Sequence, residues 1–564
     1  MPQTSRKKPF SGKAKKQQLQ AKKQSNTMTW LNKMPNLDDT NMKSAGMNVQ
    51  GSTSSGSGRN RYALRLHQES REELEAQRLE SYKSLNPVMD KDLEVDPSEY
   101  FPDDITFPKR PQWSYSMSKA EVDAQENKAL QDFLSKLESS PHWKDMSYFE
   151  LNLETWRQLW RVMEMCDILL LIVDVRYAGL MFPPALYRHI VRDERKAMLV
   201  VLNKIDLVPA SVVAAWQRHL QAAYPGLRVV YFTSCPGYNL RANYRSDDPN
   251  CRQDGETSLK IRRRKGRQRM CTEGATKVLE ACKDIVGDQV DLSSWEQKIA
   301  EESAEVVDGD EKTQVGRTIE ERPDTSYYAH EPFKHGALTV GCVGQPNAGK
   351  SALLNALMGR KVVSVSRTPG HTKHFQTIFL TPNVRLCDCP GLVFPSKVPR
   401  HIQILMGSYP IAQLREPFAV VRYLAERLDL PRMLNMAHPD GDDAWSARDV
   451  CDAWAKKNGY YTAHAARLDS NRAANSLLRM ALDGKICLWL RPPGFTDSRE
   501  EFETCDEIKY IKWVQALSKD AERGDVSSSP GASTSSEDDG DENAVSEEDN
   551  VAISNRFAAL LASD

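Results

Sequence analysis

The first strong pattern of apolar positions begins at residue 152. Trp156, Leu159, Trp160 and Met163 recur at i, i+3, i+4 and i+7, which is the spacing of one face of a helix. This spacing predicts an amphipathic helix with both tryptophans on the same face. Cofactor binding by the tryptophans is the alternative, and core packing is the expected outcome.

Short apolar runs alternate with helical patterns through the middle of the chain. The predicted strands are residues 168–173, 197–202, 229–232, 338–343, 375–380 and 384–388, and the predicted helices lie near 184–195, near 211–223 and after 349. Strands that alternate with helices predict an α/β fold with a parallel sheet.

The alternation is interrupted between residues 238 and 335. This stretch holds a basic block with seven Lys and Arg among residues 260–269, a predicted helix at 276–286 and an acidic stretch at 301–324. It is interpreted as an insertion with mobile parts.

Helical patterns dominate both flanks of the α/β region. Charged helices are predicted at residues 62–86 and 118–137, the second opened by a capping box of Ser118 and Glu121. Residues 400–516 are predicted to be mainly helical, with a short apolar run at 486–490. The expected organisation is a disordered basic arm at 1–60, a helical extension at 61–144, an α/β domain at 145–399 with its insertion at 238–335, a helical domain at 400–516, and a disordered acidic tail at 517–564.

The charge balance of 76 basic and 77 acidic residues averages over two opposite ends. Residues 1–37 hold nine Lys and Arg and no acid, whereas residues 524–555 hold nine acids and no Lys or Arg. The basic arm can serve as a nuclear or nucleolar address, as a contact for RNA phosphates, or as a solubilising tail. The acidic tail can mimic phosphates, engage basic proteins or solubilise.

The apolar runs and the cysteines exclude several classes of protein. Apolar runs of six residues, such as 168–173, are far shorter than the roughly 20 residues that span a bilayer, so no membrane span is expected. The amino terminus develops no apolar signal segment, so export is not expected. The 11 cysteines include no Cys-x-x-Cys pair, which favours reduced, mostly buried thiols over a zinc site.

The clearest chemical motif lies between a predicted strand and a predicted helix. Residues 344–351 fit the pattern G-x-x-x-x-G-K-S, in which backbone amides at a helix amino terminus cradle phosphates. Lys350 can neutralise the β and γ phosphates, and the Ser351 hydroxyl can ligate magnesium. The predicted phosphate-binding residues are Gly344, Gln345, Pro346, Asn347, Ala348, Gly349, Lys350 and Ser351.

A second motif ends the predicted strand at 384–388. Asp388 can hold magnesium through water, and the Gly391 amide can sense the γ phosphate. The predicted residues of this turn are Asp388, Cys389, Pro390 and Gly391. Between the two motifs, Thr372 is the expected hydroxyl that closes on magnesium and the γ phosphate, with Thr368 as the fallback.

A third motif distinguishes guanine from adenine. Asn203, Lys204 and Asp206 form an Asn-Lys-x-Asp turn after the apolar run 197–202. A carboxylate at Asp206 can accept hydrogen bonds from N1 and the 2-amino group of guanine, which adenine does not offer. Thr233 and Ser234 end the next strand, and the backbone near Ser234 is expected to meet the base. The predicted ligand is therefore GTP or GDP with Mg²⁺.

The order of these motifs is unusual, because the guanine motifs precede the phosphate loop. In an ordinary GTPase the phosphate loop and the two switch segments come first, as motifs one, two and three, and the two guanine motifs follow as four and five. Here the motifs occur in the order four, five, one, two, three. A cyclic shift of the chain preserves the site in space when the original termini lie close together.

This order resembles the circularly permuted GTPases of ribosome assembly, the YlqF/YawG-like family. The resemblance covers roughly residues 145–495, most closely 152–160 and 387–392, and residues 409–413 and 6–11 resemble one member of the family. It implies a P-loop GTPase that acts on preribosomal particles, ribosomal RNA or ribosomal proteins. It also implies residence in the nucleus or nucleolus, with shuttling to the cytoplasm and nuclear import through the basic arm as further expectations.

The expected activity is GTP hydrolysis, with Lys350, Thr372, Gly391 and Asn347 as the catalytic residues. Leu392 stands where many GTPases carry a water-orienting glutamine, which predicts slow intrinsic turnover. Asn347 matches the asparagine of potassium-stimulated GTPases and is expected to hold K⁺ or to brace the loop. A GTP-gated binding or scaffold protein without a ribosomal role is the alternative function.

Overall fold

The computed structural model describes residues 71–114, 116–233, 254–308, 331–366, 375–462 and 467–523. For residues 71, 254–268, 303–308 and 517–523 only the backbone is described. Within these ranges no helix has the length and apolar character needed to cross a membrane. The basic arm, residues 524–564 of the predicted acidic tail, Thr368, Thr372 and Ser234 lie outside the described residues. Residues 517–523 of the predicted tail form the end of a helix, Asp506–Arg523.

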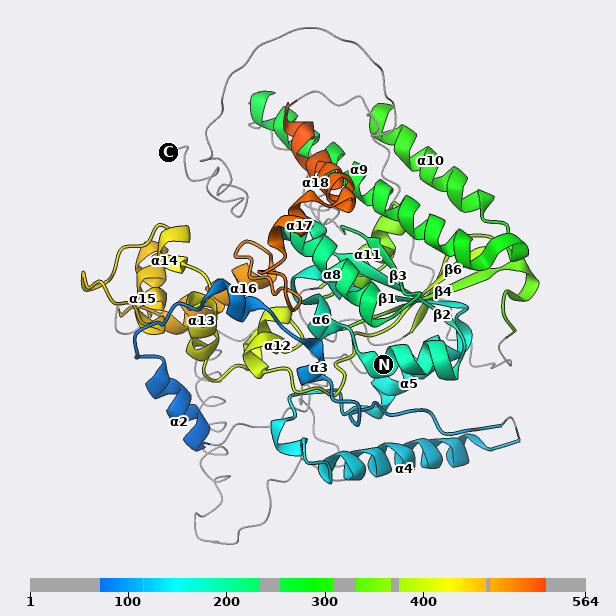
Figure 1. The fold of residues 1–564 in the computed structure, drawn as a ribbon, viewed down its shortest axis with the longest axis horizontal. Coiled ribbons are helices and arrows are strands. Elements are labelled where there is room, and N and C mark those ends of the chain that lie inside the picture. Colours follow the sequence, from blue (N-terminus) through cyan, green and yellow to red (C-terminus); the bar gives the residue numbers. More distant parts are fainter. Residues whose placement is uncertain are drawn as a thin grey trace, which may run out of the picture. The chain divides into compact units, whose positions relative to one another are not determined.

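A six-stranded sheet organises the α/β part of the chain (Figure 1). Its strands are β1 (Ile168–Asp174), β2 (Ala197–Asn203), β3 (Arg228–Tyr231), β4 (Leu338–Val343), β5 (Gln376–Thr381) and β6 (Val384–Asp388). They lie in the order β3-β2-β1-β4-β6-β5, so chain segments on both sides of the 238–335 stretch form one sheet.

The sheet is parallel except at one edge. β5 pairs antiparallel with β6, whereas the alternation of strands and helices predicts parallel pairing. Only Pro382 and Asn383 separate these two strands, and so short a link permits a hairpin but not a parallel crossover. β1 is buried along its whole length, as expected for a central parallel strand.

The helices surround this sheet and continue beyond it. The α-helices are α2 (Arg71–Glu80), α3 (Pro97–Tyr100), α4 (Lys119–Glu138), α5 (Leu153–Met165), α6 (Ala178–Met181), α7 (Pro184–Arg188), α8 (Ala210–Ala223), α9 (Asp254–Val286), α10 (Ser293–Asp308), α11 (Lys350–Leu357), α12 (Arg400–Met406), α13 (Phe418–Ala425), α14 (Leu430–Met433), α15 (Ala447–Lys457), α16 (Ser470–Leu482), α17 (Arg499–Thr504) and α18 (Asp506–Arg523). Short helical turns are η1 (Asp90–Leu93), η2 (Trp143–Asp145), η3 (Val175–Tyr177), η4 (His189–Asp193), η5 (Ile205–Leu207), η7 (Gly287–Gln289), η8 (Lys334–Gly336) and η9 (Ile411–Gln413).

Two helix predictions are confirmed in detail. Ser118 caps α4 and forms the predicted capping box with Glu121. Trp156 and Trp160 of α5 are 0% and 1% exposed and donate their indole N–H groups to backbone carbonyl oxygens. Both tryptophans are therefore core residues, as their spacing predicts.

The helix predicted at 276–286 is wrong in extent. α9 runs without interruption over 33 residues, from Asp254 to Val286, and therefore includes the basic block. Seven charges within ten residues obscure an apolar periodicity, so the pattern reveals only the carboxyl-terminal part. The nine described cysteines are buried and have free thiols.

A buried carboxylate fastens α4 to the α/β part. Glu126 is 2% exposed and accepts hydrogen bonds from Arg110 at 2.9 Å and from Arg157 at 2.6 Å. A buried charge is tolerated only when it is paired in this way. Charge pairing, rather than an apolar stripe alone, thus positions α4 beside α5.

The carboxyl-terminal helices divide between two neighbourhoods. α13, α15 and α16 pack against one another, whereas α17 packs on α8 and α18 packs on α8 and α9 (Figure 1). The apolar run at 486–490 is buried and bonds to the α/β part, since Leu490 N donates to Arg176 O at 2.8 Å and Leu490 O accepts from Trp216 Nε1 at 3.0 Å.

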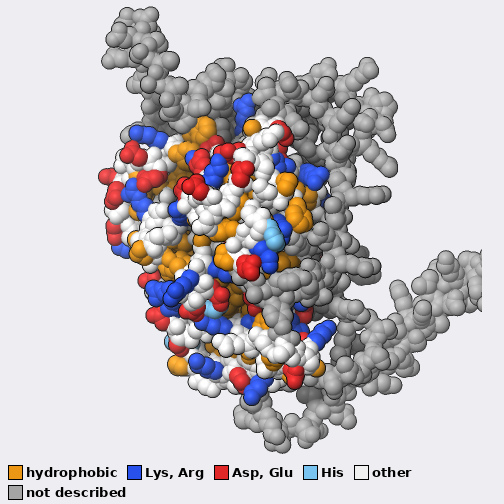
Figure 2. Space-filling view, turned by 90° about the vertical axis from the view of Figure 1, so that its right-hand side faces the viewer, with side chains coloured by type: hydrophobic (Ala, Val, Ile, Leu, Met, Phe, Trp, Pro, Cys, Tyr) orange, Lys and Arg blue, Asp and Glu red, His pale blue; other side chains and the backbone are white. Residues whose placement is uncertain are grey.

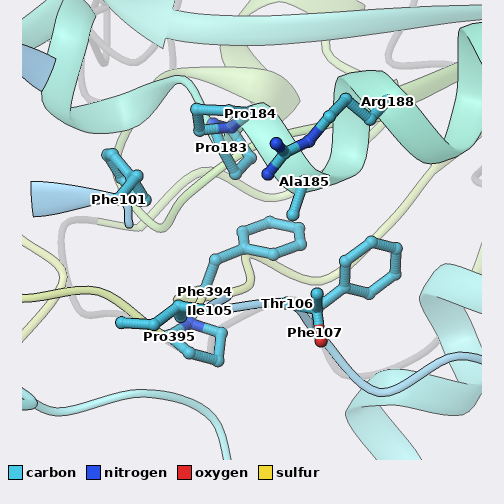
Figure 3. A pocket seen from close by; sticks show the side chains of 10 residues that line it. All are labelled: Phe101, Ile105, Thr106, Phe107, Pro183, Pro184, Ala185, Arg188, Phe394 and Pro395. Atoms are coloured by element: carbon cyan, nitrogen blue, oxygen red, sulfur yellow. The ribbon is translucent and has the colours of Figure 1, made fainter. Parts of the chain in front are cut away.

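The chain that follows Gly391 is held by aromatic packing before it reaches α12. The Phe394 ring points between Ala185 and Phe107 (Figure 3), and its centroid lies 5.8 Å from Phe107 and 5.7 Å from Trp156. The cavity lined by these side chains holds only about 10 Å³, too little for a ligand. This region is therefore a packed joint between the amino-terminal extension, α5 and the segment after β6.

Candidate functional site

The carboxyl ends of four neighbouring strands bring the predicted motifs to one edge of the sheet. Asp174 at the end of β1 is paired in register with Asn203 at the end of β2. Cys342 near the end of β4 is paired with Asp388 at the end of β6. Loops that leave parallel strands at their carboxyl ends form the usual ligand crevice of such sheets.

The phosphate loop, residues 344–349, joins β4 to α11 in a compact turn. Asn347 and Gly349 have φ angles of 59° and 106°, in the left-handed region. A Cβ added to Gly344 would lie 2.3 Å from Ile172 O, so only glycine fits against β1 at that point. The loop therefore curls back over the end of the neighbouring strand, directly before the amino terminus of α11.

Lys350 folds back over this loop. Its Nζ donates to Gly344 O at 2.9 Å and to Gln345 O at 2.8 Å, and the residue is 7% exposed. Burial lowers the pKa of Lys350, and the nearby Asp388 carboxylate opposes that shift. A phosphate bound at the loop would place negative charge beside this buried ammonium group.

Asp388 and Ser351 present oxygen atoms at the same place. Ser351 Oγ donates to Asp388 Oδ2 at 3.4 Å. Among the described residues, Asp388 Oδ1 is buried and has no hydrogen-bond partner. Burial raises the pKa of Asp388 to about 6, although Lys350 opposes the shift. An unpartnered buried carboxylate oxygen beside a hydroxyl is a donor set that fits Mg²⁺, which prefers oxygen ligands.

The turn after β6 lies directly against the phosphate loop. A Cβ added to Gly391 would lie 2.7 Å from Pro346 Cα and 3.1 Å from Lys350 Nζ. Leu392 N donates to Gly344 O at 3.2 Å, and the Leu392 side chain is fully buried. Cys389 and Pro390 between these residues are also buried.

The guanine motif contacts the phosphate loop from the other side. Asn203 Nδ2 donates to Ala348 O at 2.7 Å, and Lys204 Nζ donates to Asn347 O at 2.8 Å. Thr233 Oγ1 donates to Asp206 Oδ1, which links the ends of β2 and β3. The structure thus brings Asn203, Lys204, Asp206 and Thr233 together with the loop that lies some 140 residues further along the chain.

Lys204 is supported by a buried ion pair that the motifs do not predict. Asp174 Oδ2 accepts from Lys204 Nζ at 2.6 Å and from Arg176 Nη2 at 2.8 Å. Burial alone would raise the pKa of Asp174, but the charges of Arg176 and Lys204 outweigh it and hold this pKa well below its usual value. Arg176 also donates to Ala481 O of α16 at 2.8 Å. The only sequence signal for this pair is two charges directly after an apolar strand.

Two phosphate-loop side chains bond to the end of α12. Gln345 Oε1 accepts from Ser408 Oγ at 2.8 Å, and Asn347 Nδ2 donates to Gly407 O at 2.8 Å. Gln345 Nε2 also donates to Leu180 O at 3.1 Å. The loop is therefore tied to the first helix after the β6 turn, a contact that motif spacing does not reveal.

Comparisons with known proteins agree with this geometry. The family model described as 50S ribosome-binding GTPase matches residues 339–420. Guanine nucleotide-binding protein-like 1 from Homo sapiens is 42% identical over 551 residues, covering 90% of this chain and 89% of that protein. Large subunit GTPase 1 from Saccharomyces cerevisiae is 30% identical over 440 residues, covering 72% of this chain and 61% of that protein.

One solved structure, GNP-bound YlqF from T. maritima, has a TM-score of 0.34 at 15% identity and covers 60% of this chain and 98% of its own. The member of the family that residues 6–11 and 409–413 resemble is guanine nucleotide-binding protein-like 1. The long match at 42% identity confirms the family inferred from the motifs. This chain belongs to the GTPase family of guanine nucleotide-binding protein-like 1.

Proposed function

We propose that this protein is a GTP-controlled switch with slow intrinsic hydrolysis that acts in ribosome biogenesis, on the large subunit. The observation that supports nucleotide binding is the direct contact of three motifs. The guanine motif bonds to Ala348 O and Asn347 O, and the turn at Gly391 and Leu392 lies against Pro346 and Gly344. One nucleotide bound at this edge would touch all three.

The permuted motif order is part of the proposal. The guanine motif at the end of β2 and the phosphate loop after β4 lie at the same edge of one sheet, on either side of β1, although the first precedes the second in the chain. This arrangement supports the order four, five, one, two, three. The proposal includes an α/β domain at 145–399 with its insertion at 238–335 and a helical domain at 400–516.

The roles of the side chains follow from the chemistry of phosphoryl transfer. Lys350 would bind the β and γ phosphates, and the loop amides would orient them. Asp206 would accept from guanine, with Thr233 holding its carboxylate in place. Ser351 and Asp388, with Thr372, would hold Mg²⁺, which neutralises charge on the phosphates when it is bound.

Leu392 supports slow turnover. Its side chain is apolar and buried, and its amide donates to Gly344 O, so neither group is available to orient an attacking water. Orientation of that water contributes a large share of the rate in GTPases that carry a glutamine at this place. A partner is therefore expected to supply or order the missing group.

The bonds between the loop and α12 give a route from nucleotide to partner. Gln345 and Asn347 hold Ser408 and Gly407, so a loop that rearranges around a γ phosphate would pull on α12. GTP and GDP would then favour different orientations of the helical part. Hydrolysis would release whichever partner binds the GTP orientation.

Two basic segments and the names of the relatives support a ribosomal partner. One face of the protein carries interspersed Lys, Arg, Asp and Glu side chains (Figure 2). RNA phosphates would be met by the basic arm and by the block at 260–269, because positive charge is concentrated in these two segments of the sequence. The basic arm would also engage the nuclear import machinery, which places the protein in the nucleus or nucleolus with shuttling to the cytoplasm.

Turnover of GTP by the full chain in potassium buffer tests this proposal. Large ribosomal subunits are expected to raise the rate at least about tenfold, because activating partners supply groups absent from the isolated site. Lys350→Ala is the blank. Unchanged turnover with intact GTP binding, together with no nucleotide-dependent cosedimentation, would contradict the ribosomal role and favour a GTP-gated scaffold.

Potassium is expected to stimulate this turnover through Asn347. An amide oxygen that holds K⁺ beside the β and γ phosphates adds positive charge where negative charge develops. Hydrolysis in KCl should exceed that in NaCl at least about tenfold, and Asn347→Ala should abolish the difference. Ser408→Ala is the matched control, since it removes the neighbouring tether to α12 and leaves Asn347 in place. If potassium still stimulates Asn347→Ala, the asparagine does not hold K⁺ and only braces the phosphate loop.

A further inference from the structure

A helix from the end of the described chain touches the guanine motif from outside. Gln515 of α18 donates through Nε2 to Ile205 O at 2.7 Å and to Val208 O at 3.0 Å. A side-chain amide nitrogen carries two hydrogens, and two carbonyl oxygens of the loop accept from it here. Ile205 lies within the Asn-Lys-x-Asp turn, so Gln515 bonds to the backbone that carries Asp206.

The second guanine motif is braced by α9. Cys271 Sγ donates to Thr233 O at 3.3 Å. Gly274 lies against the Phe232 ring so closely that an added Cβ would be 2.5 Å from Cδ2. α9 therefore fixes the strand end that presents Thr233, which in turn donates to Asp206.

The two helices are joined to each other. α18 lies beside α9 (Figure 1), and Tyr510 OH donates to Glu273 Oε1 at 2.6 Å. Lys277 of α9 lies 5.4 Å from the centroid of the Tyr510 ring. Arg218 of α8 adds an ion pair to Glu507 of α18 at 3.0 Å. α18 is thus held to α8 and α9 by side-chain contacts, and to the loop by Gln515.

We propose that Gln515 is a positioning residue for the guanine-specificity loop, and that α18 acts as a clasp that slows the release of guanine nucleotides. In this proposal the loop that carries Asp206 moves when the base leaves, and that movement breaks both bonds from Gln515. A partner that lifts α18 would accelerate exchange. This inference rests on the proposed GTP binding and adds to it a route by which exchange is controlled.

The dissociation rate of a fluorescent GDP analogue from the full chain tests the clasp, with excess unlabelled GDP as the chase. Gln515→Met keeps the length of the side chain and removes both donors, and it is expected to release GDP about tenfold faster. Lys512→Ala, an exposed position on the same helix, is the matched control and should release GDP at the rate of the unaltered chain.

A second ligand separates positioning from general loosening. Inosine diphosphate (IDP) differs from GDP in lacking the 2-amino group that Asp206 would hold. Gln515→Met should therefore accelerate the release of IDP less than it accelerates the release of GDP. Equal acceleration of both ligands, or GDP release within twofold of the unaltered chain, overturns the proposal. Gln515→Leu, which also removes the donors and adds no charge, provides the same comparison if the methionine variant does not fold. Failure of the unaltered chain to bind GDP at all would instead reject the proposed function.

Discussion

Replacing Lys350 by Met or Ala is expected to lower GTP affinity by about three orders of magnitude. Each charge-assisted hydrogen bond contributes about 1.5–3 kcal/mol, and the ammonium group of Lys350 would make at least two to the β and γ phosphates. The loss of about 4 kcal/mol corresponds to roughly a thousandfold change. Turnover at saturating GTP should also fall, because the charge on the leaving phosphate is no longer neutralised.

In the nucleotide-free protein, this substitution removes the donor that Lys350 supplies to the carbonyl oxygens of Gly344 and Gln345 and the positive charge beside the buried Asp388. Buried acceptors that lose their partner cost stability, and methionine limits the loss because it fills a similar volume. Thermal unfolding should therefore show a somewhat lower midpoint without nucleotide, and no increase when GTP and Mg²⁺ are added. Lys361→Ala at an exposed position is the control. A stabilising effect of GTP that persists in Lys350→Met would contradict the assignment.

Replacing Asp206 by Asn is expected to exchange the preferred base. Guanine offers two donors at N1 and the 2-amino group, and an amide supplies only one acceptor for them. One guanine donor would then face the amide without an acceptor. Because unpaired polar groups in a binding site lower affinity strongly, GTP affinity should fall at least about a hundredfold. Xanthine carries a carbonyl in place of the 2-amino group, so the affinity for XTP should rise.

The local structure around this substitution should persist. The oxygen of the asparagine amide can still accept from Thr233 Oγ1, which bonds to Asp206 Oδ1 in the native protein. Competition of GTP and XTP for a fluorescent nucleotide measures the exchange, and Asp132→Asn on the exposed surface of α4 is the control. Loss of both GTP and XTP binding in a protein with native thermal stability would remove Asp206 from base recognition.

The strands and the phosphate loop were predictable because the physics that forms them is local. The fully apolar run of β1 requires burial on both faces of a sheet, and the helix of Trp156 and Trp160 follows from a spacing of three and four residues. Gly344 of the loop is required because a Cβ at this position would lie 2.3 Å from Ile172 O. The antiparallel edge at β5 was missed, although its cause, a link of two residues, is also local.

The supporting contacts of the site could not be predicted from spacing. Arg176 is a buried cation between Asp174 and Ala481, and its place directly after an apolar strand does not show which groups it contacts. The contact at the end of α12, where the carbonyl oxygen of Gly407 accepts from Asn347 Nδ2, is also not predictable from the sequence around it. Such polar contacts depend on which backbone carbonyl lies within reach after folding, and a motif carries no information about that.

The sequence by itself determined the strands, the phosphate loop, the turn at Asp388 and the guanine motif, because each depends on residues that are close in the chain. Tertiary structure decided how these pieces are held. Gln515 meets Ile205 across 310 positions, and the phosphate loop meets Gly407 across 60. Contacts at such separations arise only when whole helices pack against the sheet, since packing and not periodicity chooses their partners.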